Sequence, residues 1–520
     1  MPLKDDTRAE ERAIVDQEIT ELVDKLCILR SKRNRLASIS QLPPELLTRI
    51  FFLFQSRREN DSAYYQWTVI TQVSSEWRKL IFETPWLWGK IVQPDAHKLS
   101  QWAITSFARA GSSSALEVHA PCVDFNHPVS DFVISLLSEI HRIRTAEVVV
   151  VVGEEGDLNS PEPPGHLDRL KKCLDQPAPI LQSLSLKTYP QGPVLSPDLS
   201  FGGMAPALRE LNLWHVKIDW KVIPLQNLTS LVLTSFDSGC EMLLGELLDV
   251  LSMTERLQEL EVDRSITRRR EDTPYNQRGN IPLRSLTTLT LSFHWHGLIA
   301  FFTVVSIPRL TSVHLTTWPD PGRGDNWEDF LRPFSTCFIN GMVSFGRIEI
   351  GLRSSFSLCA LDFWECSDPN NAGSPLISVK FSQRDIRVCN EIIRHVPVTQ
   401  LHSLRIDYSE QHAGAWELTN FTFPPTLTNL QLSGQFVPWF CDHLQENPSS
   451  FPLLEFLELG FYSDIEAKLG AVHSALQIWR KQVRGNLKGL KLIGFAHRLE
   501  DFSEALSRLD TFVDAKVSMG

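Results

Sequence analysis

The sequence has no long hydrophobic run. Its fully apolar runs are short, and the one from Val148 to Val152 is typical of a buried strand. A membrane-spanning helix would need about 20 apolar residues. The first residues, Met1 to Asp6, lead into charge instead of an apolar segment, so we expect no secretion signal and no membrane partner.

Cysteine is scarce and scattered. The chain has nine cysteines, and even the closest pair, Cys359 and Cys366, is separated by six residues. No pair has the spacing of metal ligands. We therefore predict free thiols in a reducing compartment, which means a cytoplasmic or nuclear location or both.

Basic residues are outnumbered. The chain has 51 Lys and Arg against 62 Asp and Glu, which gives a formal net charge of −11 at pH 7. A general nucleic-acid-binding protein normally has a basic excess. We therefore expect no nucleic-acid partner.

The motifs of common enzyme classes are also missing. The sequence has no G-x-x-x-x-G-K-[ST] phosphate loop, no G-x-G-x-x-G that opens a helix after a strand, no H-E-x-x-H and no G-x-S-x-G. His294 and His296 would share one face of a strand, but two imidazoles without a third ligand are more typical of a protein surface than of a metal site. We expect no enzymatic activity, no catalytic residue, no metal and no cofactor.

Residues 8–38 predict one long helix with a heptad seam. Apolar side chains recur at alternating spacings of four and three, with Arg33 in the gap, and charged residues surround them. The apolar members of the seam are Val15, Ile19, Leu22, Leu26, Leu29 and Leu36. The seam can pack on its own protein or pair with a second chain, and the sequence leaves both open.

The stretch LPPELLTRIFFLFQS, from Leu42 to Ser56, predicts a short helix with a large hydrophobic surface. Pro43 and Pro44 suit a first helical turn, and Glu45 suits the positive end of a helix. A second apolar-periodic run, WTVITQVSSEWRKLIFETPWLWGKI, follows a polar break. Two or three short helices, which together contain about 50 residues, cannot bury so much aromatic surface alone. We therefore expect a docking face for another protein.

Residues 40–92 resemble an F-box. The resemblance rests on Leu42-Pro43-x-Glu45-Leu46-Leu47-x-x-Ile50-Phe51, then Val73-x-x-x-Trp77-Arg78-x-Leu80, then Pro85-Trp86-Leu87-Trp88. It implies docking on the Skp-type adaptor of SCF cullin-RING ubiquitin ligases and, through the adaptor, on a cullin. Carried over position by position, the adaptor-contacting residues are Leu42, Pro43, Glu45, Leu46, Ile50, Phe51, Val73, Trp77 and Leu80.

Two features depart from the usual F-box pattern. Ser74 stands where the family usually has a cysteine, and the stretch between Phe54 and Trp67 is several residues longer than the commonest spacing. We place the insertion in a loop. The arrangement is similar to that of the F-box proteins of mushroom-type fungi, which often carry a heptad helix in front of the F-box.

A short pattern recurs from residue 181 onward. Hexamers of the form hydrophobic-x-x-hydrophobic-x-hydrophobic start at Leu181, Leu208, Leu228, Leu257, Leu286, Leu310, Phe345, Leu376, Leu401, Leu427, Leu454 and Leu487. They span 306 residues with a mean period near 28, within the range of leucine-rich repeats. Each copy predicts a short strand whose hydrophobic positions face a shared core, backed by a helix. An α/β domain whose strands happen to begin with leucine is the alternative.

The expected fold class is therefore α + α/β. We predict the N-terminal heptad helix over residues 8–38 and a small all-helical F-box over residues 40–92. A linker and N-terminal cap with degenerate repeats at Ala115 and Ile143 would follow over residues 93–180. An irregular leucine-rich-repeat α/β solenoid would occupy residues 181–520.

Residues between the core positions of each predicted strand would point to one outer face. Most of them are polar, but aromatic and basic residues, which often anchor protein interfaces, occur among and beside them. The candidate target-binding residues are Trp214, His294, His314, Trp318, Arg347, Lys380, Arg405 and Phe456. A solvated face with scattered aromatic residues packed under loops is the alternative. Long inserts at 264–280, 319–333 and 362–375 are further candidates for recognition loops.

The resemblance predicts a substrate receptor of a cullin-RING ubiquitin ligase. The F-box would hold the adaptor, the repeats would bind an as yet unidentified target protein, and the chain would act by proximity. A leucine-rich-repeat protein-binding scaffold without a role in ubiquitination is the alternative function.

Overall fold

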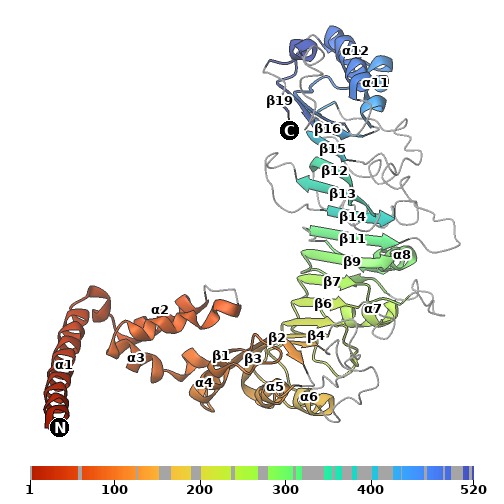
Figure 1. Ribbon diagram of the computed structural model, residues 1–520. Helices are drawn as coiled ribbons and strands as arrows, with labels where there is room; N and C mark the ends of the chain where they lie inside the picture. The colour runs from red at the N-terminus through yellow and green to blue at the C-terminus, as the bar shows by residue number, and fades with distance from the viewer. Residues whose placement is uncertain are drawn as a thin grey trace. The chain divides into compact units, whose positions relative to one another are not determined.

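The computed structural model combines helices and strands, with a long N-terminal helix and parallel strands (Figure 1). The mixed class expected from the sequence is confirmed. The residues that the structure describes are 3–56, 61–124, 127–151, 166–188, 201–235, 241–267, 279–308, 312–318, 345–353, 358–365, 377–382, 401–407, 425–434, 436–461, 465–483, 486–493, 507–514 and 518–519.

The chain divides into two compact units. One contains Met1–Glu210 and Val216–Pro224, and the other contains Leu211–His215 and Leu225–Gly520. Residues 93–180 contain strands and belong to the first unit, together with the helices that precede them.

The long helix α1 (Leu3–Arg35) covers nearly all of the helix predicted over residues 8–38. The C-terminal end of α1 contacts the rest of the first unit. Asn34 Nδ2 donates to the carbonyl oxygen of Val73 at 2.9 Å, and Arg35 Nε lies 3.2 Å from Glu76 Oε1. A short 3-10 helix, η1 (Ser38–Gln41), leads to the next helix.

A small helical module follows α1. It consists of α2 (Pro44–Ser56), the 3-10 helix η2 (Asp61–Gln72), α3 (Ser75–Phe82) and the 3-10 helix η3 (Pro85–Trp88). Its core is aromatic: the ring centroids of Trp67 and Trp88 lie 5.3 Å apart, and those of Phe51 and Trp77 lie 5.1 Å apart. Burying these large rings stabilises helices that are too short to persist alone.

The first unit also contains four parallel strands, paired in chain order. They are β1 (Lys90–Val92), β2 (Leu116–Asp124), β3 (Ile143–Val151) and β4 (Ser183–Thr188). The connections hold α4 (Gln101–Ala110), α5 (Val129–Leu137), η4 (Ile140–Arg142) and α6 (His166–Leu174). These helices provide the crossovers that parallel strands require.

The described part of residues 93–180 contains two long strands where we expected a linker and N-terminal cap with degenerate repeats. The predicted degenerate copies at Ala115 and Ile143 correspond to β2 and β3, each nine residues long. Apolar and polar side chains alternate along β2, which lets one of its faces join the core. The regular pairing of strands therefore starts at Lys90, well before residue 181.

In the second unit, four parallel strands lie side by side in chain order (Figure 1). They are β6 (Ser230–Thr234), β7 (Glu259–Asp263), β9 (Thr288–His294) and β11 (Ser312–Trp318). Helices α7 (Leu244–Ser252) and α8 (Trp295–Val304) lie in the connections. The short strands β8 (Ile281–Pro282) and β10 (Val305–Ser306) form a separate parallel pair. The 3-10 helix η5 (Phe201–Gly203) belongs to the first unit. Strand β5 (Glu210–Trp214) begins in the first unit and continues in the second.

The strand order changes in the centre of the second unit. Strand β11 pairs with β14 (Ile377–Ser382), which continues through β13 (Leu358–Glu365) to β12 (Phe345–Arg353) and β15 (Ser403–Asp407). The pairs of β13 are antiparallel. The order of the strands therefore departs from chain order here, because the unpredicted strand β13 lies between β12 and β14. Residues 362–365 of β13 belong to the insert that we expected over residues 362–375.

The C-terminal part returns to parallel pairing in chain order. Strands β15, β16 (Asn429–Ser433), β17 (Phe456–Gly460), β18 (Gly489–Ile493) and β19 (Ser518–Met519) follow one another. Helices α11 (Phe436–Glu446) and α12 (Ile465–Val483) lie in their connections, and η11 (Asp510–Phe512) precedes β19. The indole of Trp479 on α12 is buried and donates to the carbonyl oxygen of Phe451 at 3.1 Å.

Each of the twelve predicted hexamers overlaps a strand. Among the described residues, the same backbone hydrogen bonds recur from one strand to the next and fix how neighbouring strands are aligned. The carbonyl oxygen of Thr428 accepts from the amides of Glu455 and Phe456, and that of Glu455 accepts from Lys488 and Gly489 one strand later. Leucines at the same place in successive strands therefore enter one core, as Leu430, Leu457 and Leu490 do.

No helix among the described residues is both long and apolar enough to cross a membrane.

Candidate docking surfaces

Helix α2 has two apolar faces. Leu47 and Phe51, one turn apart, are buried against the rest of the helical module. Leu46, Ile50 and Leu53 recur at spacings of four and three on another face, and 49%, 40% and 54% of their respective surfaces are exposed. Leu42 and Pro43 precede this stripe, at the start of the helix. We call Leu42, Pro43, Leu46, Ile50 and Leu53 the α2 face.

Buried contacts hold α2 in this orientation. Gln55 Nε2 donates to the carbonyl oxygen of Leu87 at 3.1 Å, and Gln55 is itself buried. The indole of Trp88 donates to the carbonyl oxygen of Ile81 at 3.0 Å. Because α2 is tied on its inner side to α3 and η3, its exposed leucines cannot turn inward without breaking these contacts.

The structure places most of the predicted adaptor-contacting residues at the surface. Pro43, Glu45, Leu46, Ile50 and Val73 are exposed, and Leu42, Trp77 and Leu80 are half-buried. Phe51 is different, because it is 1% exposed and packs on the ring of Trp77. It belongs to the core of the module and acts on the α2 face only by positioning the helix.

The helical module also exposes hydrophobic residues that we did not predict as adaptor contacts. They are Phe52, Leu53, Val69, Phe82 and Trp86. The ring centroids of Phe52 and Trp86 lie 5.8 Å apart, so α2 and η3 meet at the surface. The helical spacing from Leu46 to Leu53 was visible in the sequence and could have identified Leu53, whereas the exposure of Trp86 depends on the packing of η3.

The two departures from the F-box pattern have structural counterparts. Ser74 is the N-cap of α3, and its hydroxyl accepts from the amide of Trp77 at 3.1 Å, a role that favours serine. We expected the insertion between Phe54 and Trp67 to be a loop. Residues 61–66 instead form the start of η2, and residues 57–60 lie outside the described part.

The strands present a second candidate surface. Along β6, β7, β16 and β18, buried and more exposed residues alternate, as a sheet with one solvated face requires. Trp214 on β5 and Phe456 on β17 are 37% and 47% exposed on this side of their strands. His294, His314 and Arg405 are half-buried.

The strand register brings some of the candidate target-binding residues together and separates others. Trp318 pairs with His294 across β11 and β9. Arg347 pairs with Ser403, and Lys380 pairs with Thr316. Five strands (β14, β13, β12, β15 and β16) separate β11 from β17, so the candidates do not form one patch. The side chains of Trp318, Arg347 and Lys380 lie outside the described part of the structure, as do residues 268–278, 319–333 and 366–375 of the predicted recognition loops.

The C-terminal strands form a compact exposed patch around Phe456. Gly489 lies beside it, and a Cβ atom at this glycine would come within 3.0 Å of the Phe456 ring. In the next row, Glu458 accepts from Gln431 and pairs with Lys491, whose Nζ lies 3.2 Å from Glu458 Oε2. The Phe456 ring thus packs against Gly489, and the neighbouring row of the sheet holds the polar side chains of Gln431, Glu458 and Lys491.

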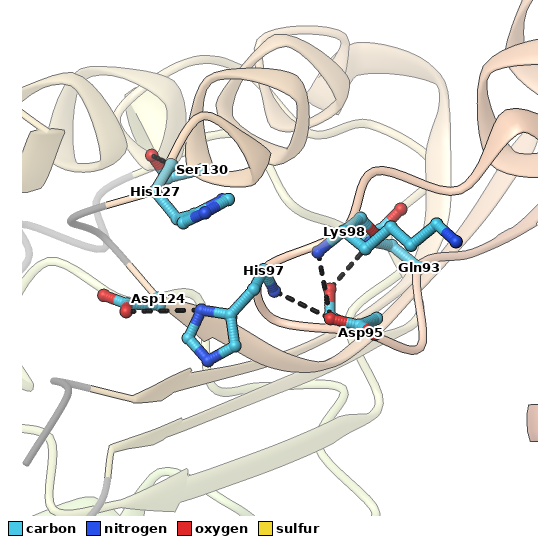
Figure 2. Close-up of polar contacts among 7 residues, drawn as sticks. All are labelled: Gln93, Asp95, His97, Lys98, Asp124, His127 and Ser130. Atoms are coloured by element: carbon cyan, nitrogen blue, oxygen red, sulfur yellow. Dashed lines mark hydrogen bonds and ion pairs between the residues drawn. The ribbon is translucent and has the colours of Figure 1, made fainter.

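A polar cluster follows β1 (Figure 2). Gln93 is buried and donates to the carbonyl oxygens of Asp95 and Lys98 at 2.7 and 2.9 Å. Asp95 Oδ1 accepts from the amides of His97 and Lys98, which holds the pKa of this carboxyl below its ordinary value. His97 Nδ1 lies 3.7 Å from Asp124 Oδ2. These bonds explain how the turn after β1 keeps its shape.

A charged group lies on the outer side of β2, β3 and β4. Glu147 Oε2 lies 3.5 Å from His119 Nδ1, and Glu147 Oε1 lies 3.4 Å from Lys187 Nζ. The hydrogen bond from His119, and then the charge of Lys187, lower the pKa of Glu147 to about 2 against the opposing effect of burial. The group consists of partners on neighbouring strands and stabilises their pairing.

Within the described residues, no three or more His, Cys, Asp or Glu side chains are placed to hold a metal ion. Burial raises the pKa of the Cys441 thiol to about 12, which is the property of an inert core cysteine. Among the residues described, the exposed hydrophobic residues of α2 and of the strands are the strongest candidates for a functional surface.

No protein-family model matches the chain, and no curated protein is significantly similar to it.

Proposed function

We propose that this protein is the substrate-recognition subunit of an SCF-type cullin-RING ubiquitin ligase. Its helical module docks on a Skp-type adaptor, and its strand array binds a target protein. The single observation that carries the proposal is the α2 face. The helix with the Leu-Pro-x-Glu start exposes Leu46, Ile50 and Leu53 although its opposite side is fully packed.

The exposure of these aliphatic side chains to water is unfavourable. Each leucine or isoleucine side chain that leaves water gains about 1.5–3 kcal/mol when fully buried. The exposed rings of Phe52 and Trp86 lie 5.8 Å apart on the same helical module and add aromatic surface that a partner can cover. Buried Phe51 and Gln55 hold the helix rigid, so little order has to be gained on binding.

The repeated strands support the second half of the proposal. Their regular pairing and their buried leucine positions agree with a leucine-rich-repeat solenoid, in which each repeat closes its core against the next. Exposed Phe456 and Trp214 are the anchors on which we propose that a target protein binds. The chain itself performs no bond chemistry and works by holding target and ligase together, in the cytosol or the nucleus.

The α2 face is tested with purified full-length chain and a purified Skp-type adaptor, by isothermal calorimetry. The variant Leu46→Asp/Ile50→Asp forces two carboxylates into the contact. We expect the wild type to bind, and we expect the variant to bind about a hundredfold more weakly or not at all. Both side chains are exposed in the free protein, so the variant should keep its fold. Circular dichroism checks that it does.

Leu453→Asp is the matched control. Leu453 is 56% exposed and lies on the loop before β17, so the control adds the same charge to an exposed leucine elsewhere. We expect it to bind the adaptor like the wild type. No binding by the wild type, or equal binding by the α2-face variant, would refute adaptor docking. Ubiquitin-dependent turnover of a bound partner then distinguishes a ligase receptor from a scaffold.

A further inference from the structure

The seam of α1 is exposed along its whole described length. Between 45% and 67% of the surface of each seam residue from Val15 to Leu29 is accessible to solvent. Val23, next to the seam, is 51% exposed. A row of large aliphatic side chains in water favours burial against another surface.

The contacts of α1 with its own protein lie on the opposite side of the helix. In the heptad in which Ile19 and Leu26 occupy position a, and Leu22 and Leu29 occupy position d, Asn34 and Arg35 occupy positions b and c. These two residues contact Val73 and Glu76. The seam therefore points away from the part of the molecule that anchors the helix.

The charges along α1 are unevenly distributed. Acidic residues predominate in the first half and basic residues in the second half. The acidic residues of α1 are Asp5, Asp6, Glu10, Glu11, Asp16, Glu18, Glu21 and Asp24. The basic residues are Lys4, Arg8 and Arg12 in the first half and Lys25, Arg30, Lys32, Arg33 and Arg35 in the second half. Two such helices attract each other when they run in opposite directions and repel each other when they run in the same direction.

We infer that α1 pairs with α1 of a second copy of this chain as an antiparallel coiled coil. In the register that places Ile19 against Leu29 and Leu22 against Leu26 of the second copy, all four aliphatic layers are filled. Val23 then meets Val23 of the second copy at the symmetry axis, which extends the apolar contact.

The flanking charges fit this register. Glu18 faces Lys32 of the second copy, and Asp16 faces Arg30 of the second copy; by symmetry, each pair occurs twice. At the e and g positions, the one like-charge contact is that of Lys25 with Lys25 of the second copy, near the symmetry axis. The heptad rule for e and g positions thus gives four attractive contacts.

A parallel pair would be unfavourable. Its e and g positions would place Glu11 against Asp16, and Lys25 against Arg30, of the second copy. Arg33, at an a position, would face its own counterpart. These like charges disfavour the parallel arrangement, so the occupant that the charge pattern selects is an antiparallel second copy.

The test measures the mass of the full-length chain in solution by sedimentation equilibrium. Protein concentrations of about 10 to 100 µM are suitable because a helix pair of this length is only moderately stable. We expect the wild type to be a dimer. Glu18→Lys places two pairs of like charges in the antiparallel contact and should weaken dimerisation about ten- to thirtyfold.

The double variant Glu18→Lys/Lys32→Glu decides the orientation. It restores both pairs in the antiparallel register, so dimerisation should return to the wild-type level. In a parallel pair these two positions would face Val23 and Ala37, and no rescue would follow. Both positions are exposed, so the variants should keep the fold. A monomeric wild type, or variants that dimerise alike, would overturn the inference.

Discussion

At the scale of single residues, Glu147 shows how a charged side chain can stabilise neighbouring strands. Its carboxylate lies between His119 on β2 and Lys187 on β4, and all three side chains lie on the outer side of the sheet. The sequence does not indicate this group, because its members are 28 and 40 residues apart along the chain and meet only through the strand register.

We expect Glu147→Gln to lower the free energy of unfolding by about 0.5–1 kcal/mol at pH 7, a small effect because the carboxylate is partly solvated. The pKa is lowered from 4.5 to about 2 in the folded protein. The contribution of Glu147 is therefore complete above pH 4.5 and is lost as the pH falls toward 2. The difference between wild type and variant should shrink over that range in urea unfolding experiments.

Glu117→Gln is the control for this prediction. Glu117 lies on β2, and its substitution removes a carboxylate while leaving the contacts of Glu147 in place. A Glu147→Gln variant whose deficit stays constant from pH 7 to pH 2 would show that the lost stability does not come from the ionised carboxylate.

At the scale of secondary structure, Gly89 joins the helical module to the first strands. It follows η3, and its carbonyl oxygen accepts from the amide of Glu117 at 2.9 Å. A Cβ atom at this position would lie 2.4 Å from the carbonyl oxygen of Ala115, which is a backbone atom and cannot rotate away. The connection between η3 and β1 therefore requires glycine for its close approach to β2.

We expect Gly89→Ala to lower the free energy of unfolding by about 1–3 kcal/mol, because the backbone has to shift to admit the methyl group. Gly470→Ala in α12 is the matched control, since a Cβ atom there meets nothing within 4 Å. The control should gain about 0.5–1 kcal/mol through higher helix propensity. Thermal and urea unfolding measure both effects, and equal changes in the two variants would contradict the prediction.

At the scale of the whole molecule, two proposed interaction surfaces lie on different helices of the first unit. The seam belongs to α1, and the α2 face belongs to the helical module. Asn34 and Arg35 hold α1 on the side away from its seam. Dimerisation and adaptor docking should therefore be independent events.

We expect the complex of wild type and adaptor to contain two chains and two adaptors, measured by light scattering on the purified complex. Glu18→Lys should change the number of chains and leave the adaptor affinity within about twofold of the wild type. Leu46→Asp/Ile50→Asp should abolish adaptor binding and leave the dimer intact. A two-to-one complex, or an adaptor that dissociates the dimer, would contradict this independence.

The sequence by itself determined the local elements. Heptad spacing specified α1, the Leu-Pro-x-Glu start specified α2, and each leucine hexamer specified a strand, because hydrophobic periodicity directly reflects which face of an element is buried. Only the tertiary structure decided that β13 inserts antiparallel between β12 and β14, that Phe51 is core while Leu53 is exposed, and that Glu147 meets Lys187. These features depend on contacts between residues far apart in the chain, and no local pattern encodes which distant partner a strand or a ring will meet.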